Sequence, residues 1–445
     1  MIVASAPLDQ HALTLLRDHD PVVQRYRAFF ALLDWSQVAE RDQTHPWPGS
    51  RPHPQAAYVK ALFIKLCEHQ AYISHLRSFL VEHPLLVLEL GFHLVPDPTQ
   101  FYGFDVEQTV PTERWLRHKQ QTLDNRLLQA LLRETVHALQ AEIPGLGTTV
   151  AFDVKHIYAW VEQNNPKAYV SERYNPAHQP AGDPDCRLGV KRSTNQERPD
   201  GSTTERKEYV WGYGTGVAAA TDPCYGDVVL AEYTQPFNEA DSTYYHPLHR
   251  QTVATLGTAP TNVTADAAFD AWHIYQTCAE PGGIAAIPLN TRGHAVPQRD
   301  ADGVPRCPSG LRMDASYKYD HTEGYRAQVF RCPLLFPQAS GESCEHEQFV
   351  KGPGCIKHIN IEVGGQMRVM LDREAEAYKA LYRQRTAAER INSQAKAYGI
   401  ERPMVRNSCS VGNLNTLTYI VINAQALQRA RSFNAARAVL TPTLC

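Results

Sequence analysis

The sequence predicts an α/β protein with an all-helical N-terminal part, and three observations support this. Residues 54–139 carry apolar side chains at helical spacing, for example at Leu123, Leu127 and Leu131. From residue 148 onward, several short runs are rich in β-branched and aromatic residues, which are typical of strands. Residues 368–399 then form the strongest helical pattern in the chain.

Length and composition limit the possible classes of protein. At 445 residues the chain exceeds the usual size of one hydrophobic core, so we expect two or three structural units. Hydrophobic residues make up 43% and no run of eighteen apolar residues occurs, so we predict no membrane span. The N-terminus lacks the basic and then apolar pattern of a secretion signal, so we expect a cytoplasmic protein with free rather than disulfide-bonded cysteines.

Positive charge is concentrated near the C-terminus. The net charge of −3 argues against a uniformly basic protein that coats DNA. From residue 372 to the end, however, eleven Lys and Arg residues face five Asp and Glu residues. This local excess predicts a basic surface in the last part of the chain.

Strand signals begin directly after the N-terminal helices. Residues 148–161 are predicted to form a strand that carries Asp153. Residues 163–206 are polar without apolar periodicity and are predicted to form an extended loop. Residues 209–220 and 227–235 then read as two strands, joined by a turn into a β-hairpin.

A helix and further strands follow the hairpin. Residues 241–256 fit a helix that Asp241 or Ser242 caps. A short strand is predicted to end at Asp266, and residues 282–290 suit another strand.

We therefore divide the chain into four parts. These are a helical N-terminal domain over residues 1–146, the first part of a core over 147–290, an irregular Cys-rich insertion over 291–365, and the last part of the core over 366–445. The last part carries the long helix and the basic tail.

Four polar residues of the predicted long helix have the spacing Y-(2)-R-(3)-E-(6)-K, namely Tyr382, Arg385, Glu389 and Lys396. At about 100° per residue they share an arc of about 60°, so they would form one stripe roughly 21 Å long. A carboxylate can hold a hard cation, while Arg and Lys bind phosphate oxygens. The alternative is an ordinary exposed, salt-bridged helix face.

This tetrad resembles the YREK signature of bacterial insertion-sequence transposases, a branch of the DDE recombinases. The resemblance implies an RNase H-like mixed sheet flanked by helices. It also implies that Glu389 is the third metal-binding carboxylate and that Tyr382, Arg385 and Lys396 contact DNA near the cleaved end.

Two upstream aspartates complete the resemblance. Asp153, in VAFDVKHIYAW, is similar to the first family aspartate, and Asp266, in TADAAFD, is similar to the second. Asp270 remains an alternative for the second position. The helical segment at residues 54–80 is similar to the segment that precedes the core in many such transposases, and the resemblance implies that the helical domain over residues 1–146 binds DNA.

Three carboxylates gathered at one point would repel one another unless a cation lay between them. We therefore expect Asp153, Asp266 and Glu389 to bind two Mg²⁺ ions, with Mn²⁺ as a substitute. The resemblance implies cleavage at transposon ends and strand transfer into target DNA. Two alternatives stay open: an RNase H-like nuclease that does not join strands, and a transposase-derived DNA-binding regulator.

The resemblance also implies partners and a location. The partner is double-stranded DNA, both as terminal inverted repeats and as target. Two transposon ends must be held together, so we expect a homodimer in the DNA complex. A bacterial transposase would act in the cytoplasm at the nucleoid.

The insertion contains candidate zinc ligands, but their spacing is loose and includes no C-x₂-C pair. A structural Zn²⁺ site and ordinary buried thiols are therefore both open. The residues concerned are Cys307, Cys332, Cys344, Cys355, His346 and His358.

Two other features have structural interpretations. His156 falls on the opposite face of the strand from Asp153, which favours a packing or supporting role. The GYGTG run at residues 212–216 lacks the Lys-Ser/Thr of a phosphate-binding loop, so its glycines indicate a close approach of backbones.

Overall fold

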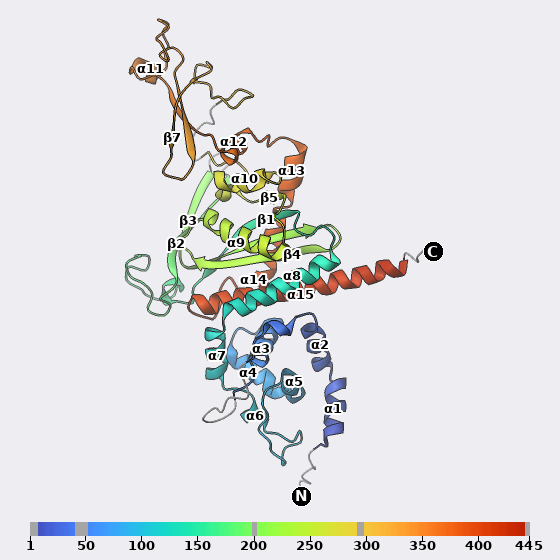
Figure 1. The fold of residues 1–445 in the computed structure, drawn as a ribbon. Coiled ribbons are helices and arrows are strands. Elements are labelled where there is room, and N and C mark those ends of the chain that lie inside the picture. The colour runs from blue at the N-terminus through green and yellow to red at the C-terminus, as the bar shows by residue number, and fades with distance from the viewer. Residues whose placement is uncertain (1–7, 41–51, 198–202, 292–297, 441–445) are drawn as a thin grey trace. The chain divides into compact units, whose positions relative to one another are not determined.

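The computed structural model describes residues 8–40, 52–197, 203–291 and 298–440 (Figure 1). The chain divides into two compact units. Unit 1 contains Met1–Gly147, Asp153–Thr258 and Thr386–Cys445, and unit 2 contains Thr148–Phe152 and Ala259–Arg385. In the described part of the chain, no helix has both the length and the apolar character needed to cross a bilayer.

Unit 1 begins with short helices that confirm the predicted helical N-terminal part. Asp9 and Asp20 cap the first two of them by accepting hydrogen bonds from backbone N–H groups. Val59 and Phe63 are fully buried in the third. The helices are α1 (Gln10–His19), α2 (Pro21–Phe30), α3 (Gln55–Cys67), α4 (Ile73–Glu82), α5 (Pro84–Leu90), α6 (Val106–Thr109) and α7 (Glu113–Thr122).

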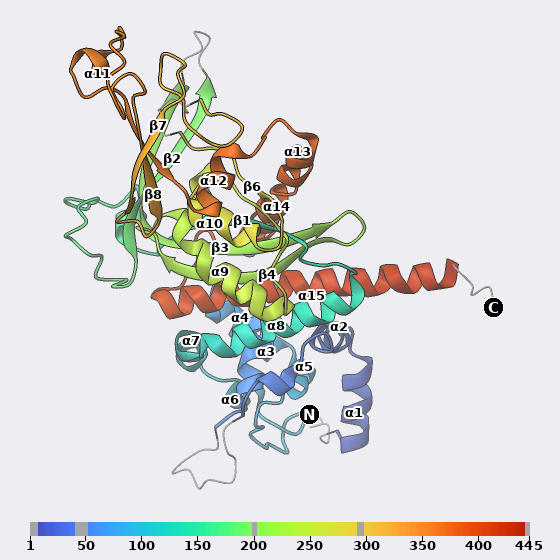
Figure 2. The same cartoon turned by 45° about the horizontal axis from the view of Figure 1, so that its top comes forward.

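Two long helices lie side by side in unit 1, α8 (Asn125–Glu142) and α15 (Ser408–Leu440), and both contact the sheet at its fourth strand (Figures 1 and 2). Asn423 of α15 donates a hydrogen bond to the Val229 carbonyl at 2.8 Å and accepts one from the Val229 N–H at 2.9 Å. The amide of Asn423 thus replaces a strand partner at this point of the sheet.

The sheet of unit 1 contains the predicted hairpin. β3 (Thr203–Asp222) and β4 (Gly226–Pro236) pair antiparallel from the turn at Asp222 and Gly226 onward. The predicted loop is wrong in part, because β2 (Arg187–Glu197) lies within it and pairs antiparallel with β3. β2 has a strand neighbour on one side only, so its sequence needs little apolar alternation.

The glycines of the GYGTG run allow close packing, as predicted. A Cβ at Gly212 would lie 2.0 Å from the carbonyl oxygen of Ile157, and one at Gly214 would lie 2.1 Å from the hydroxyl of Tyr244. No side chain fits at Gly212 without movement of the backbone.

β1 (Thr149–Tyr158) has the predicted position, and its first three residues pair parallel with β5 (Asn262–Thr264). β5 pairs parallel with β6 (Ala285–Ala286), and the strand order is β2-β3-β1-β5-β6 with β4 beside β3. Parallel and antiparallel pairs therefore occur in one sheet. This mixed sheet with flanking helices is consistent with an RNase H-like transposase core.

Two of the flanking helices are α9 (Asp241–Leu256) and α10 (Trp272–Ala279). α9 has the predicted bounds, but the predicted cap is wrong. The residue before the helix is Ala240, which offers no side-chain cap, and Asp241 lies within the first turn. There its charge still suits the positive end of the helix dipole.

The Cys-rich insertion is not irregular, contrary to the prediction. In unit 2 it forms an antiparallel sheet of β7 (Asp314–Asp320), β8 (Arg326–Arg331) and β9 (Ile356–Asn360), with the short helix α11 (Glu347–Val350). Its small core consists of Cys307, Met313, Phe330, Cys332, Leu334, Cys355 and Ile359. The sequence did not reveal this sheet, because short strands with many exposed residues show little alternation of apolar and polar side chains.

The predicted single helix over residues 368–399 is wrong, because three helices occupy this part of the chain. They are α12 (Val363–Met370), α13 (Glu376–Arg383) and α14 (Thr386–Ala397). At the first break, the guanidinium of Arg373 donates to the carbonyls of Ile287, Arg368 and Leu371. At the second break, between α13 and α14, two backbone N–H groups donate to the carbonyls three residues earlier in the chain. These bonds tighten the last turn of α13.

Candidate active site

Asp153 lies on β1 in unit 1 and is half-buried. One of its carboxylate oxygens accepts a hydrogen bond at 2.9 Å from the side-chain amide of Asn392, a buried residue of α14. This bond holds the helix of the predicted third carboxylate against the strand of the first. Asn392 was not predicted as a site residue, because nothing in the sequence distinguishes it from other polar residues of a helix.

Glu389 lies in the first turn of α14 and is exposed. It precedes Asn392 by three residues, so the two side chains lie about 60° apart on the same side of the helix. Ala388 and Ile391 are fully buried on the neighbouring side of α14, as the sequence predicted. The helix thus carries Glu389 on the side whose amide bonds Asp153.

An ion pair between the exposed Arg390 and a buried aspartate sets the rotation of α14. The Nε and Nη2 atoms of Arg390 lie 2.7 and 2.6 Å from the two carboxylate oxygens of Asp227 on β4, which is buried. The third nitrogen of Arg390 donates to Thr386 at 2.7 Å. A paired, planar contact of this kind fixes direction as well as distance.

Lys396 is exposed at the end of α14 and lies 2.9 Å from a carboxylate oxygen of Glu401. Lys155 lies 3.3 Å from the same oxygen. Burial alone would raise the pKa of Glu401, but the two lysines outweigh it and the pKa is lowered. Glu401 therefore stays ionised and holds two cations near β1.

Tyr382 and Arg385 belong to unit 2, whereas Glu389 and Lys396 belong to unit 1. The predicted single stripe of four residues is therefore wrong, since α13 ends at Arg383 and α14 begins at Thr386. The Arg385 guanidinium lies 5.5 Å from the centre of the Tyr382 ring, a cation–π contact. The helical break leaves the two halves of the tetrad as separate pairs.

Asp266 lies in unit 2, directly after β5, and is half-buried. Its carboxylate accepts one hydrogen bond, at 2.9 Å, from the N–H of Ala268 and caps the short helix Ala267–Phe269. No cation pairs with it among the residues that the structure describes. The carboxylate therefore keeps coordination capacity for a metal ion.

Asp270, the alternative for the second position, has the opposite surroundings. Its side chain is completely buried, and Arg368 donates to both oxygens at 2.9 and 2.6 Å. Tyr275 and the backbone of Asn290 donate further bonds at 2.8 and 2.7 Å. Four donors leave little room for a metal, which favours Asp266 as the site residue and gives Asp270 a structural role.

The predicted zinc ligands are not arranged as a metal site. Cys307, Cys332 and Cys355 lie in the apolar core of the β7–β9 sheet, and Cys344 packs against it. Over the described ranges, no three His, Cys, Asp or Glu side chains are grouped so that they could hold an ion, and this includes the three candidate carboxylates as well as the cysteines. The alternative of ordinary thiols fits this arrangement, and every cysteine that the structure describes is free.

Glu232 of β4 is a buried carboxylate that the sequence analysis missed. It accepts hydrogen bonds from Gln129 of α8 and Thr416 of α15. Burial raises its pKa to about 7. The sequence feature that could have identified this buried carboxylate is a single Glu within the mainly apolar run VVLAEYT. Its neutral partners indicate a role in joining two helices to the sheet.

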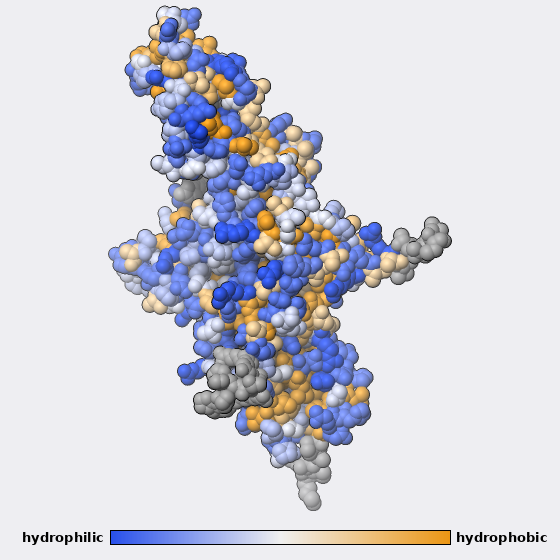
Figure 3. Space-filling model, in the orientation of Figure 1, coloured by the Kyte–Doolittle hydropathy of each residue, from blue (hydrophilic) through white to orange (hydrophobic). Residues whose placement is uncertain are grey.

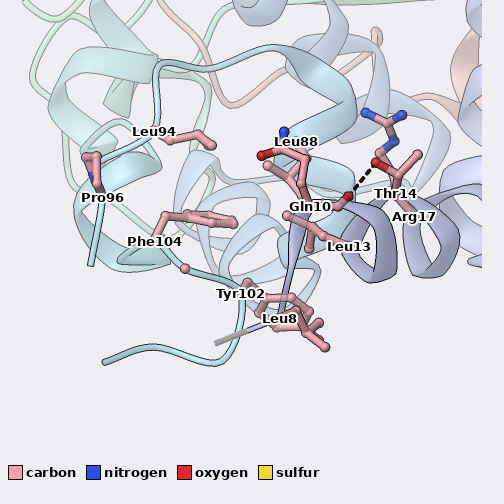
Figure 4. A pocket seen from close by; sticks show the side chains of 11 residues that line it. Leu8, Gln10, Leu13, Thr14, Arg17, Leu88, Leu94, Pro96, Tyr102 and Phe104 are labelled. Carbon is pink, nitrogen blue, oxygen red and sulfur yellow. Dashed lines mark hydrogen bonds between the residues drawn. The ribbon is translucent and has the colours of Figure 1, made fainter. Parts of the chain in front are cut away.

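His156 packs against Phe237, with ring centres 4.4 Å apart, and burial lowers its pKa to about 4. A cavity of about 270 Å³ between the N-terminal helices is lined mainly by apolar side chains such as Leu13, Leu88 and Phe104 (Figure 4). The lining includes Arg17 but no carboxylate. Neither place carries the groups that hydrolysis of a phosphodiester requires.

Hydrophobic side chains also reach the surface of the N-terminal helices (Figure 3). Leu15 and Leu16 of α1 are 53% and 42% exposed, and Leu94 and Phe101 are exposed to a similar extent. This surface is unsuited to phosphate binding.

A comparison with protein families matches residues 189–424 to the transposase DDE domain, which covers more than half of the chain. The protein therefore belongs to the family of transposases with a DDE domain, and membership implies nuclease and transferase activity. The matched region contains Asp266 and Glu389 but begins after Asp153.

Among solved structures, the chain is similar to that of a piggyBac transposase synaptic complex with hairpin DNA. The identity is 10% and the TM-score 0.31, over 99% of this chain and 85% of that one. A comparison with curated proteins finds no match.

Proposed function

We propose that this transposase cleaves DNA at transposon ends and transfers the strands into target DNA with Asp153, Asp266 and Glu389. The observation that carries the proposal is the bond from Asn392 to Asp153, which joins the strand of the first carboxylate to the helix of the third. The family match adds support, because it includes Asp266 and Glu389. The few protein donors at Asp266 also suit a metal ligand.

The donor set fits Mg²⁺, with Mn²⁺ as a substitute, because hard divalent cations prefer carboxylate oxygens. Asp153, Asp266 and Glu389 would hold two such ions, which would supply activation of a water or a 3′-hydroxyl and stabilisation of the leaving oxygen. Asn392 orients Asp153 through its amide, and the Arg390–Asp227 pair fixes the direction of α14. These contacts hold two of the carboxylates before DNA arrives.

The proposed DNA contacts differ in chemistry. Lys396 offers an exposed ammonium group, and Arg385 offers a planar guanidinium beside the Tyr382 ring. We propose that these three residues bind phosphates and bases near the cleaved end. The partner is double-stranded DNA, as inverted repeat and as target, bound by a homodimer in the bacterial cytoplasm at the nucleoid.

The test uses purified full-length protein with labelled transposon ends, a supercoiled target plasmid and Mg²⁺. Wild type should cleave the ends and insert pre-cut ends into the plasmid, while Glu389→Gln should do neither. Glu376→Gln is the matched control, because Glu376 is exposed on the neighbouring helix α13. Cleavage by Glu389→Gln at the wild-type rate would refute the assignment of the third carboxylate.

The same assay separates the alternatives. Cleavage without insertion of pre-cut ends would identify a nuclease. Binding of the ends without cleavage by wild type would identify a regulator.

A further inference from the structure

A cavity of about 470 Å³ lies in unit 1 where the chain leaves β1, and we propose that it binds single-stranded DNA. This rests on the proposed function, because it assigns part of the DNA substrate to a place beside Asp153. We call it the Trp160 pocket. It is lined in part by Tyr158, Trp160, Asn164, Arg402, Met404 and Arg406.

Two guanidinium groups in the pocket stack on aromatic rings instead of pairing with carboxylates. The Arg402 guanidinium lies 4.1 Å from the centre of the Tyr158 ring, and that of Arg406 lies 4.8 Å from the Trp160 ring. Within the described residues, neither forms an ion pair. Glu162 is the single carboxylate of the lining. The Nε–H of Arg406 donates to the Trp160 carbonyl at 3.1 Å, so the Nη groups of Arg406 and the N–H groups of Arg402 remain available for phosphate oxygens.

The aromatic surface suits a base. The Trp160 residue is 43% exposed, although large apolar side chains are usually buried. Bases of a duplex keep their faces within the stack, whereas a single strand can place a base against an exposed aromatic ring. Stacking on a ring with cations beside it binds bases of any sequence, so we expect little sequence preference.

The pocket is held rigid by hydrogen bonds before any ligand binds. The amide of Asn164 donates to the carbonyls of Ala159 and Trp211 at 2.8 and 2.7 Å, and its oxygen accepts from the Trp211 N–H. The N–H of Tyr158 donates to the carbonyl of Glu401 at 2.9 Å, which joins the two walls. A site fixed in this way loses little entropy on binding.

Further positive charge connects the pocket with the candidate active site. Glu401, which precedes Arg402, holds Lys155 and Lys396 through its carboxylate. Asp153 and Tyr158 are five residues apart on β1, or about 16 Å along an extended strand. Lys155 shares the face of Asp153 and Tyr158 lies on the other face, so a DNA strand that passes Asp153 and Lys155 would reach the pocket around the end of β1.

The test is a binding experiment in EDTA, so that no cleavage contributes. Fluorescence anisotropy would compare a blunt duplex with the same duplex carrying a single-stranded extension. Wild type should bind the extended DNA more tightly. Trp160→Ala and the double variant Arg402→Ala/Arg406→Ala should each lose that preference, with affinity for the extension about tenfold weaker or more. The double variant should also show a shallower dependence of affinity on salt.

Arg126→Ala is the control, because Arg126 is an exposed arginine of unit 1 that pairs with Asp124. It should bind both DNAs like wild type, and thermal melting should show that all variants are folded. Equal preference for extended DNA in wild type and the folded double variant would overturn the proposal. If wild type prefers the extended DNA in the binding experiment but cleaves no DNA in Mg²⁺, the Trp160 pocket is supported and the proposed function is refuted. If wild type cleaves DNA but shows no preference for the extended DNA, the proposed function is supported and the Trp160 pocket is refuted.

Discussion

Asp266 and Asp270 are four residues apart in unit 2 and have opposite surroundings. Asp266 is half-buried and accepts one backbone bond, whereas Asp270 is completely buried and accepts four donors, two of them from Arg368. A carboxylate whose two oxygens are both bonded to an arginine stabilises the fold but has little capacity left to coordinate a metal ion. The number and charge of the protein donors therefore differ between the two aspartates in a way that the sequence alone could not show, and they favour Asp266 as the proposed metal ligand.

The largest expected effect is on catalysis at Asp266. Asp266→Asn should lower the rate of end cleavage about a thousandfold or more, because an amide is a poor ligand for Mg²⁺ and the metal contributes several kcal/mol to the transition state. The free energy of unfolding should change little, since the helix cap is kept by the amide oxygen. Cleavage kinetics and urea denaturation of the same sample would check both. Near-wild-type cleavage would remove Asp266 from the site.

Asp270 should show the converse pattern. Arg368→Met leaves a buried carboxylate without its cation and should lower the free energy of unfolding by about 3–5 kcal/mol. Urea denaturation followed by tryptophan fluorescence measures this loss. Activity per folded molecule should be retained. A fully folded but inactive variant would instead indicate that Arg368 or Asp270 takes part in the reaction.

Glu232 extends the comparison to a buried carboxylate whose hydrogen-bond donors are uncharged side chains. Its pKa is about 7 in the folded protein against an ordinary value of 4.5, so the folded state holds the proton more tightly. The contribution of Glu232 to the free energy of unfolding is therefore fully present below about pH 4.5 and falls by about 3 kcal/mol as pH rises to 7. Glu232→Gln should remove this fall.

The measurement is urea denaturation of both proteins between pH 4.5 and 8. His53 and His156, whose pKa values burial lowers to about 4, have the opposite effect, since stability rises as they lose their protons in the unfolded chain. They are present in both proteins, so they cancel in the difference. A constant difference between the two proteins across this range would refute the prediction.

The smallest expected effect concerns the orientation of Asp153. Asn392→Ala should lower cleavage about tenfold, because Asp153 keeps its charge but loses the amide that holds its direction. Ser393→Ala, the next and exposed position of α14, is the control and should behave like wild type. If both variants cleave equally well, the bond from Asn392 has no part in positioning Asp153.

Local sequence patterns predicted the elements that depend on local interactions. β1, the β3–β4 hairpin and the bounds of α9 are confirmed, since alternation, turn residues and helical spacing determine them. The breaks between α12, α13 and α14 were missed. The first depends on Arg373 reaching the carbonyl of Ile287, which is 86 residues away in the chain.

The candidate site shows the same limit. Asp153, Asp266 and Glu389 came from a resemblance in spacing, and their joint role remains a prediction. Asn392 could not be found, because its partner lies 239 residues away and a helix contains many polar residues. Asp270 could be separated from Asp266 only after the arginine beside it was seen.

α15 has a consequence for the biosynthesis of the protein. Its side chains complete the interior of unit 1, for example where Asn413 bonds the Leu123 carbonyl and Asn423 bonds Val229. These residues leave the ribosome after the other described elements of unit 1, and most of unit 2 is a continuous segment made before them. Unit 1 therefore cannot finish folding until α15 has been made, and a polypeptide interrupted before α15 would lack a stable framework for Asp153.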